Sequence, residues 1–245
     1  MKISVITAVW NREKTIAHAI ESVLKQNYSP IEYVIQDGGS TDRTLDIIHK
    51  VAPEAKIVSA KDHGIYDAIN RGISRCTGDV IGLMHSDDYF AHDNVLANVA
   101  RTIEESGADG VYSDLDYVSF GDTNRIVRRW AAGRYSKKKI ARGWMPPHPT
   151  VYIKREVFYK LGLYDTNFHI AADYDAMLRF LSNGVSLAYL PEVTVKMRTG
   201  GESNASIKTI FRKSQEDYSA LRKNRVGGLG ALLFKNLSKA GQFIH

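Results

Sequence analysis

The chain has 245 residues, of which 44% are hydrophobic and 24% charged, and this balance excludes an intrinsically disordered protein. The single cysteine, Cys76, excludes an internal disulfide framework and any multi-cysteine zinc or iron–sulfur site. The net charge of +6 is uneven, since residues 125–142 hold 8 basic and no acidic residues whereas the first half is acidic. Nucleic-acid binders spread basic charge with interleaved aromatic residues over a reading face, so we expect no nucleic acid partner.

The N-terminal segment and the hydropathy of the chain bear on its location. Charge interrupts the first 14 residues too early for a secretory signal peptide, and no run of about 20 apolar residues could span a membrane. We therefore expect a cytoplasmic protein, with peripheral association at the inner face of the cell membrane as an additional option.

Strands and helices alternate along the first half of the chain. Residues 3–9 are apolar and predict a buried strand, and residues 13–25 have apolar positions at helical spacing. Such alternation predicts a mostly parallel sheet with helices on both faces, in which ligands bind at the carboxyl ends of the strands. Thr41 or Asp42 can cap the second helix. The remaining predicted elements are strands over 31–36, 56–59, 80–84 and 109–113, and helices over 43–50, 64–75 and 93–106.

The pattern changes after residue 114. We divide the chain into a domain over 1–204, with a first half over 1–114 and a second half over 115–204, and a basic helical tail over 205–245. The tail predicts two helices within 206–241, separated near Gly227-Gly228. In the second half we predict strands or a hairpin over 115–130, a basic loop over 131–149, a strand then a helix over 150–162, a helix over 173–182 and a strand-rich segment over 185–198.

The adjacent carboxylates Asp87 and Asp88 directly follow a predicted apolar strand. Two carboxylates at a strand end can hold a hard divalent cation such as Mg²⁺ or Mn²⁺, which also binds substrate phosphates. The alternative is a helix cap followed by an acidic first turn. A mixed metal site of His85, His92 and Asp93 is a weaker alternative.

Two further acidic positions have both a chemical and a structural interpretation. Asp37 follows a strand and opens a Gly-Gly-Ser-Thr turn, where it can accept an N–H from a nucleobase or simply form an Asx-type turn. Asp173 opens a predicted helix, with Asp175 in its first turn, and either caps this helix or returns to the cleft as a base. The chain lacks the glycine-rich phosphate loops of dinucleotide-binding and P-loop enzymes.

Several motifs in order resemble the family 2 glycosyltransferases, over about residues 2–198. They include Asp37-Gly-Gly-Ser-Thr-Asp42, Ser86-Asp-Asp88 and Ala172-Asp-Tyr-Asp175, and the full set covers residues 4–11, 22–26, 37–44, 62–72, 77–79, 86–88, 148–150, 162–165 and 172–179. The resemblance implies the GT-A fold and an inverting, metal-dependent transfer from a nucleoside-diphosphate sugar. Compact members of the family often build bacterial surface polysaccharides, such as lipopolysaccharide O-antigen, on a lipid-linked carrier, which implies a glycan or lipid-linked acceptor.

The resemblance also implies a role for each matching residue. Asp88 would bind the Mn²⁺ or Mg²⁺ ion and Asp173 would be the catalytic base. Two departures from the family pattern are Ser86-Asp87-Asp88 in place of a spaced Asp-x-Asp triplet, and Ala172 in place of an acidic residue. The donor would be held by Thr7, Asn11 and Asp37 at the nucleoside, with Asp37 on the base, by Asp62 and Arg71 at the nucleotide or diphosphate, and by Ser86 and Asp87 near the ribose or sugar.

Two other functions remain open at this point. A nucleotidyltransferase can share the fold and the acidic pair, but it ordinarily has a glycine-rich basic loop after the first strand, where this chain has Trp10-Asn-Arg-Glu-Lys14. A non-catalytic protein that binds a membrane surface through its basic tail is the second alternative, and the acidic residues at all expected positions disfavour it.

Two segments carry predictions of their own. The loop over 131–149 should close over the diphosphate or the acceptor, unless it is a solvated basic face. In residues 229–241, leucines recur at helical spacing with Lys235 and Lys239 on another face, a pattern typical of helices that lie on anionic membranes. The alternative is a helix packed on the catalytic domain or on a second subunit in a homodimer.

Overall fold

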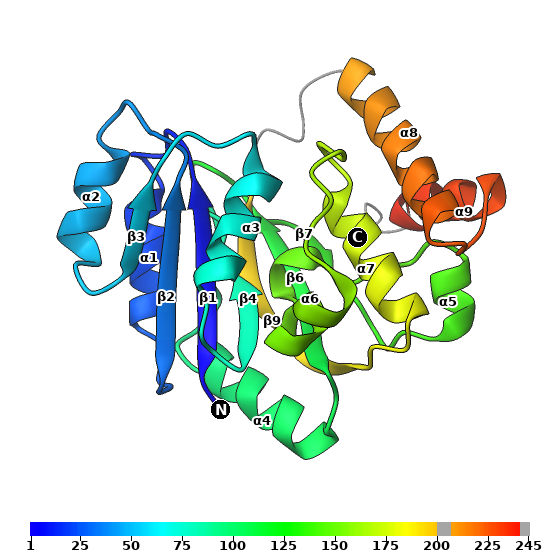
Figure 1. Cartoon of the computed structure of the whole chain (residues 1–245), viewed down its shortest axis with the longest axis horizontal. Helices are drawn as coiled ribbons and strands as arrows, with labels where there is room; N and C mark the ends of the chain where they lie inside the picture. The colour runs from blue at the N-terminus through cyan, green and yellow to red at the C-terminus, as the bar shows by residue number, and fades with distance from the viewer. Residues whose placement is uncertain (200–206, 241–245) are drawn as a thin grey trace.

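The computed structural model describes residues 1–199 and 207–240 of the chain (Figure 1). Within these residues a nine-stranded sheet has the strand order β3-β2-β1-β4-β8-β6-β9-β5, and β7 pairs with β6. Helices cover both faces of this sheet, which confirms the predicted α/β class.

The first half of the sheet is parallel, as predicted. All seven residues of β1 are buried, because helices cover the strand on both sides and an apolar run satisfies both faces. The register pairs Val9 with Asp37, so the chain leaves β1 and β2 at the same edge of the sheet. The strands are β1 (Ile3–Val9), β2 (Ile31–Asp37), β3 (Lys56–Ser59) and β4 (Val80–Leu83).

The second half of the sheet is mixed, which differs from the mostly parallel sheet that the sequence predicts. The chain inserts β8 antiparallel between β4 and β6, and β9 then pairs parallel with β6. The antiparallel pairing of β6 with β7 confirms the hairpin predicted after residue 114. These strands are β5 (Tyr89–Phe90), β6 (Gly110–Val118), β7 (Ile126–Trp130), β8 (Tyr152–Lys154) and β9 (Leu187–Arg198).

Alternate residues of β1 pack against two different sets of helices. Ile3 and Val5 belong to one hydrophobic cluster with α1, α2 and α4, whereas Ile6 and Ala8 belong to another with α3, α6 and α7. The N-cap residue of α2 is Arg43, not the predicted Thr41 or Asp42, although Asp42 accepts the N–H of Thr44, the first residue of the helix. The helices are α1 (Ile16–Leu24), α2 (Thr44–Val51), α3 (Ile65–Arg75), α4 (Val95–Ser106), α6 (Arg155–Leu161) and α7 (Ala172–Ser182).

The segment over 131–149, which the sequence predicts as a loop, contains two short helical elements. They are α5 (Lys137–Ala141) and a 3-10 turn η1 (His148–Thr150). The lysine-rich α5 has no apolar periodicity, so the sequence gives no signal for it; the structure caps it through the Ser136 hydroxyl, which accepts the N–H of Lys139.

The tail forms two helices, α8 (Ile207–Lys223) and α9 (Leu229–Ala240), with the predicted break at Gly227-Gly228. Ala220, Leu221 and Ala231 from these helices lie in the same hydrophobic cluster as α7. Figure 1 shows α8 and α9 beside α7 and α5, on the side of the molecule away from β1–β3. In residues 1–199 and 207–240, no helix combines the length and the hydropathy needed to cross a membrane.

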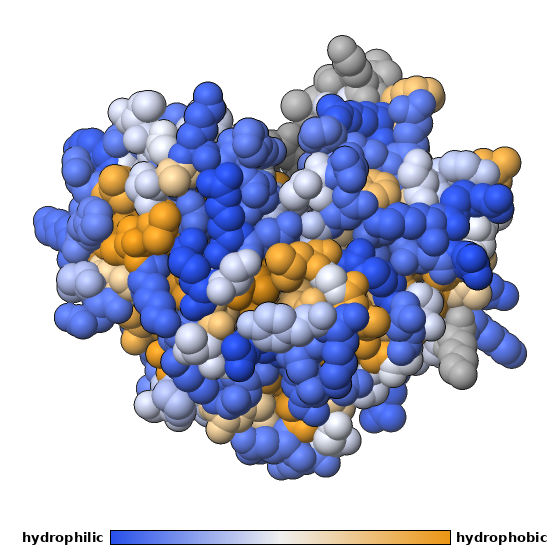
Figure 2. All heavy atoms as spheres, in the orientation of Figure 1, coloured by the Kyte–Doolittle hydropathy of each residue, from blue (hydrophilic) through white to orange (hydrophobic). Residues whose placement is uncertain are grey.

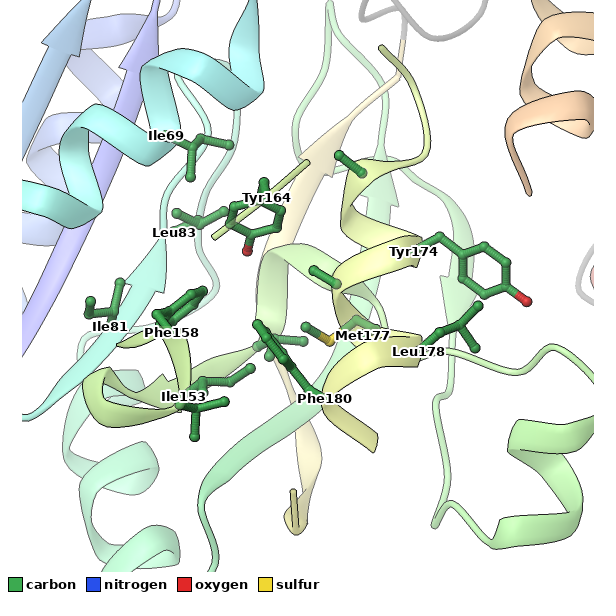
Figure 3. Packing of buried hydrophobic residues seen from close by; sticks show 14 of the residues in the cluster. Ile69, Ile81, Leu83, Ile153, Phe158, Tyr164, Tyr174, Met177, Leu178 and Phe180 are labelled. Carbon is green, nitrogen blue, oxygen red and sulfur yellow. The ribbon is translucent and has the colours of Figure 1, made fainter. Parts of the chain in front are cut away.

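The side chains of α7 pack on two sides of the helix. Figure 3 shows Phe180 pointing toward Phe158 and Ile153, while Tyr174 points away from them. On that other side the Lys235 ammonium of α9 lies 3.3 Å from the centroid of the Tyr174 ring. The same ammonium pairs with Asp217 at 2.6 Å, and both side chains are buried. Lys235 therefore joins the tail to the domain. The sequence predicts instead that Lys235 borders a membrane-facing stripe, and its burial against Asp217 and Tyr174 differs from that prediction.

Candidate active site

Parallel pairing brings the carboxyl ends of β1, β2 and β4 to one edge of the sheet. The segments that follow these strands contain Asn11, the turn that Asp37 opens, and the acidic pair Asp87-Asp88. In Figure 2 this edge lies at the top of the view, where the surface is mainly hydrophilic and the outline is notched between the lobe of β1–β3 and that of α8. The candidate residues of the first half thus lie where the sequence predicts a ligand site.

Asp37 holds its own turn together. Its side chain is fully buried, and Oδ2 accepts the N–H of Gly39 at 3.1 Å and of Ser40 at 3.0 Å. The hydroxyls of Ser40 and Ser59 donate to Oδ1 and Oδ2 at 2.5 and 2.6 Å. This is the Asx-type turn that the sequence allows, and a contact between Asp37 and a nucleobase stays a prediction.

Asn11 and Asp62 lie against the same turn. Asn11 has a positive φ of 50°, a conformation that asparagine tolerates, and its Oδ1 accepts the N–H of Thr41 at 2.8 Å. A Cβ at Gly38 would lie 2.5 Å from Oδ2 of Asp62, so the Asp62 side chain lies close against the backbone of this turn. The loops after β1, β2 and β3 therefore form one connected wall.

Thr7 and Arg71 are bound to the scaffold of this wall. Thr7 is fully buried, and its hydroxyl donates to the carbonyl of Met84 at 2.8 Å, which links β1 to the end of β4. Arg71 on α3 pairs with Asp67 at 2.7 Å and donates to the carbonyl of Lys61 at 3.0 Å. Both side chains support the loops, and their contacts with a nucleotide stay predictions.

Asp88 is a buried carboxylate with one unsatisfied oxygen. The residue is 1% exposed, Oδ1 accepts the N–H of Arg198 at 3.1 Å, and Oδ2 has no hydrogen-bond partner among the described residues. Burial and the adjacent charge of Asp87 raise the pKa of Asp88 well above its usual range, although the N–H and charge of Arg198 oppose this shift. Ser86 is also buried, whereas Asp87 is partly exposed.

Arg198, at the end of β9, donates hydrogen bonds to both residues of the acidic pair. Its guanidinium donates to the carbonyl of Asp87 and contacts Nδ1 of His18 on α1. It lies 5.0 Å from the centroid of the Tyr89 ring. The sequence gives no signal for this residue, because it comes more than a hundred positions after Asp88 and no local motif connects the two.

Asp173 lies in the first turn of α7 rather than at its N-cap, which is Ala171. Its Oδ1 accepts the N–H of Tyr174 at 2.8 Å and the hydroxyl of Tyr66 at 3.3 Å. Among the described residues Oδ2 has no hydrogen-bond partner. One oxygen is thus anchored and the other is available to an acceptor hydroxyl.

Asp175, the competing carboxylate, is bound within the fold. It is fully buried and pairs with Arg179 at 2.7 Å. Lys223 and Asn224 of the tail also contact it, at 3.2 and 2.8 Å. A carboxylate with three such partners and no exposed surface cannot reach an acceptor.

The charge of Asp173 acts on two histidines, His85 and His148. Burial lowers the pKa of His85, while the charges of Asp87 and Asp173 both act to raise it, so this ring lies within electrostatic reach of the two carboxylates. The ring of His148 lies 6.3 Å from that of His85, and its Nε2 is hydrogen-bonded to the Tyr164 hydroxyl at 2.8 Å. Burial lowers the pKa of His148 to about 4 despite the opposing charge of Asp173.

The described residues contain no group of three or more His, Cys, Asp or Glu side chains that could hold a metal ion. The mixed site of His85, His92 and Asp93 is therefore not formed, and His92 instead lies 3.7 Å from Glu192. The acidic pair still fits a hard cation, because the orphaned Oδ2 of Asp88 is the type of ligand that such ions prefer. The other ligands would have to come from the donor and from water.

Two relatives indicate what the chain is similar to in sequence. A PGL/p-HBAD biosynthesis glycosyltransferase of Mycobacterium bovis is 31% identical over 217 residues, which make up 86% of this chain and 82% of that protein. The chondroitin synthase of Pasteurella multocida is 25% identical over 99% of this chain but only 25% of the synthase.

Two solved structures share the fold. TarS 1–349 of S. aureus in complex with UDP-GlcNAc matches with a TM-score of 0.68 and 20% identity, over 92% of this chain and 66% of that chain. The mannosyltransferase PcManGT of Pyrobaculum calidifontis, in complex with GDP-Man and Mn²⁺, matches with a TM-score of 0.67 and 17% identity, over 90% of this chain and 63% of that chain. This chain thus spans about two thirds of each solved chain, and the likeness confirms the predicted GT-A fold.

The family model described as Glycosyl transferase family 2 matches residues 4–171. This match includes the turn opened by Asp37, the acidic pair and η1, and it spans more than half of the chain. The chain belongs to the glycosyl transferase family 2.

Proposed function

We propose that the protein transfers a sugar from a nucleoside-diphosphate sugar to a hydroxyl of a glycan or lipid-linked acceptor, with inversion at the sugar C1. The observation that carries this proposal is the buried carboxylate of Asp88, whose Oδ2 has no hydrogen-bond partner among the described residues, in a chain that belongs to the glycosyl transferase family 2. Asp173, with Oδ1 anchored by the N–H of Tyr174, is the carboxylate that we assign as the base of the same reaction.

Asp173 is the proposed base. As the acceptor oxygen attacks C1 from the side opposite the leaving diphosphate, Oδ2 of Asp173 takes the hydroxyl proton, while Oδ1 stays anchored by the N–H of Tyr174. A single displacement inverts the configuration at C1 and needs no nucleophile from the enzyme. His148 stays neutral above its pKa of about 4, so it adds no charge beside the base at neutral pH.

Asp88, with Asp87, is the proposed holder of Mn²⁺ or Mg²⁺. When bound, such an ion neutralises charge on the departing diphosphate. A cation beside Asp88 would also favour the ionised form of this carboxylate and so oppose the rise in its pKa that burial causes. Arg198 fixes the backbone of the pair through the Asp87 carbonyl and the Asp88 carboxylate.

The acceptor class rests on the relatives, whose names refer to PGL/p-HBAD biosynthesis and to chondroitin synthesis. By analogy we propose a role in bacterial polysaccharide or glycolipid assembly. Peripheral contact with an anionic membrane at the inner face of the cell membrane would suit a lipid-linked acceptor. Leu229 and Phe234 of α9 support such contact, since they are 65% and 47% exposed.

A thermal-shift screen of nucleotide sugars with Mn²⁺, including UDP-GlcNAc and GDP-mannose, tests the donor. A ligand that binds the folded state at about 100 times its Kd adds about 2.7 kcal/mol to the free energy of unfolding and so raises the melting temperature. Release of pyrophosphate from a nucleoside triphosphate and a sugar phosphate would instead identify a nucleotidyltransferase.

Transfer of labelled sugar from the selected donor then tests the base. Asp173→Asn should lower kcat by about 10²–10⁴-fold while sparing donor binding, because a base acts on the acceptor. Asp175→Asn is the comparison: because Asp175 is bound within the fold, this variant should lower the melting temperature and reduce kcat much less than Asp173→Asn does. If Asp173→Asn were active and Asp175→Asn were folded but inactive, the base would be Asp175 and not Asp173.

A further inference from the structure

The helix α7 begins without a side-chain cap of its own. Its N-cap residue is Ala171, which has no side-chain oxygen, and its first turn carries Asp173 and Asp175. The N–H groups at the start of a helix have no partner within the helix, and an alanine N-cap is less stabilising than a polar one. The start of the helix that carries the proposed base thus depends on atoms from elsewhere.

Glu216 on α8 binds the N-cap residue of α7 and the residue before it. Its Oε2 accepts the N–H of Ile170 at 2.7 Å and the N–H of Ala171 at 3.0 Å. Its Oε1 accepts Nε of Arg212 at 3.1 Å, and the Glu216 side chain is only 13% exposed. Burial would raise the pKa of Glu216, but the backbone N–H groups of Ile170, Ala171 and His169 outweigh burial and lower it. The carboxylate is therefore ionised at neutral pH, the form that a helix N-terminus favours.

The same tail helix also holds the other side of this turn. Asp175 is fully buried, and besides Arg179 of its own helix its partners are Lys223 and the adjacent Asn224. The first turn of α7 is thus fixed by α8 at its start, through Glu216, and at its buried side, through Asp175.

We infer that Glu216 is a positioning residue, which caps α7 from a neighbouring helix and so fixes the carboxylate of Asp173. This inference rests on the proposed function, in which Asp173 is the base. Asp173 has one oxygen bound to the N–H of Tyr174, so its carboxylate moves with the backbone of the turn. A displacement of about 1 Å from the reacting geometry can cost about 10²-fold in rate.

The test compares three variants of the full chain at Glu216 with a control on the same helix. Glu216→Ala removes the acceptor, Glu216→Asp retracts it by one methylene, and Glu216→Gln keeps an oxygen at the same reach. Asp217→Asn is the control, because it weakens the buried pair with Lys235 without contacting residues 170–171. The readouts are kcat and KM with the nucleotide sugar selected in the donor screen, the melting temperature, and amide hydrogen exchange over residues 168–176.

Glu216→Ala should lower kcat by about 10- to 100-fold with the KM for the donor unchanged, since the donor binds at the other side of the site. Amide exchange should accelerate over residues 168–176, because the N–H groups of Ile170 and Ala171 lose their acceptor. Glu216→Gln should recover most of kcat, and Glu216→Asp should not. Asp217→Asn should lower the melting temperature and keep kcat.

Two results overturn the inference. One is a Glu216→Ala enzyme with parental kcat; the other is an Asp217→Asn enzyme whose kcat falls as far, which would indicate general loosening of the tail. If Glu216→Ala does not fold, the contrast between Glu216→Gln and Glu216→Asp decides the question. Failure of the proposed base is recognised separately, because Asp173→Asn would then stay active whatever happens at Glu216.

Discussion

The Oδ2 atom of Asp88, which has no hydrogen-bond partner among the described residues, lowers the stability of the folded protein when no ligand is bound. A buried carboxylate with one unpaired oxygen and a neighbouring charge is costly to keep ionised, and its raised pKa expresses this cost. The carboxylate of Asp88, which would bind a cation, is thus also the group that destabilises the folded protein when no cation is bound. Residues with this combination are candidates for function on physical grounds alone.

Asp88→Asn should therefore raise the melting temperature in metal-free buffer and abolish the stimulation of activity by Mn²⁺. The amide keeps an acceptor for the Arg198 N–H and removes the buried charge. In the parent, Mn²⁺ with nucleoside diphosphate should raise the melting temperature, and in the variant it should not. A variant with metal-stimulated turnover close to the parent would remove Asp88 from the metal site.

His148 should make the protein less stable as the pH falls from about 6.5 to 4. Its pKa is about 4 in the folded state because it is buried, against 6.5 as its ordinary value, so in this range the unfolded chain binds a proton that the folded chain does not. At 1.36 kcal/mol per pKa unit the loss approaches about 3 kcal/mol at pH 4.

Urea unfolding of the parent and of His148→Gln across this range measures the effect. The difference between the two free energies of unfolding should change with pH below 6.5 and be constant above it. Asp173 and His85 act on the same ring, so Asp173→Asn should enlarge the effect by removing a charge that favours the protonated form. A difference that is independent of pH would show that His148 titrates normally.

At the scale of elements, local patterns account for the first half of the sheet and fail where pairing is distant. The predicted bounds of the strand Lys56–Ser59 match those found, because the β-branched pair Ile57-Val58 is a local signal for a strand. The sequence does not predict the strand β5, because its two residues, Tyr89 and Phe90, are too few to show the alternating pattern of a strand. The parallel pairing of Gly110 with Leu187 joins positions far apart in the chain, and no local pattern in either segment predicts this pairing.

The candidate site divides in the same way. Asp87, Asp88 and Asp173 lie in recognisable motifs, and the charges of Asp87 and Asp173 both act to raise the pKa of His85. Arg198 and Glu216 act on these residues from elements that come later in the chain, and each is an ordinary charged residue in its own segment. A residue that supports a site through a tertiary contact has no neighbouring pattern to mark it.

The basic segment over 131–149 should close over bound ligand only in part. Pro146, Pro147 and His148 are buried, whereas Arg134, Lys138 and Lys139 are exposed. Trypsin should therefore cleave between residues 134 and 142, and UDP with Mn²⁺ should slow this cleavage if the exposed cations contact the diphosphate. Equal cleavage rates with and without saturating ligand would favour a solvated basic face. Cleavage at Arg155, outside the segment, serves as the reference.

At the scale of the whole molecule, the tail helices pack on α7. Ala220, Leu221 and Ala231 lie in the hydrophobic cluster of α7, and Lys235 is buried against Asp217. The division at residue 204 stays a prediction, and this packing predicts that the two parts depend on each other for stability. Removal of residues 205–245 should lower the melting temperature strongly or prevent folding.

Membrane contact should accordingly be tested by surface substitution in the full chain. Replacing Leu229 and Phe234 by glutamine changes two exposed apolar side chains of α9 and should weaken co-sedimentation with anionic liposomes at low salt. High salt should weaken it further, since it screens the basic residues nearby. The matched control replaces two exposed apolar side chains outside the tail, Phe120 between β6 and β7 and Val127 of β7. Equal sedimentation of both variants and the parent would leave α9 without a role at membranes.

The cap that Glu216 places on α7 has a consequence for the protein during its synthesis. A nascent chain extends at about 5–20 residues per second, and Asp173 is made well before Glu216. Until Glu216 has been made, the residues that lead into the helix of the proposed base have no acceptor for the N–H groups of Ile170 and Ala171. Transfer activity should therefore begin only when α8 has been translated and has docked, and incomplete chains that end before it should consume little donor.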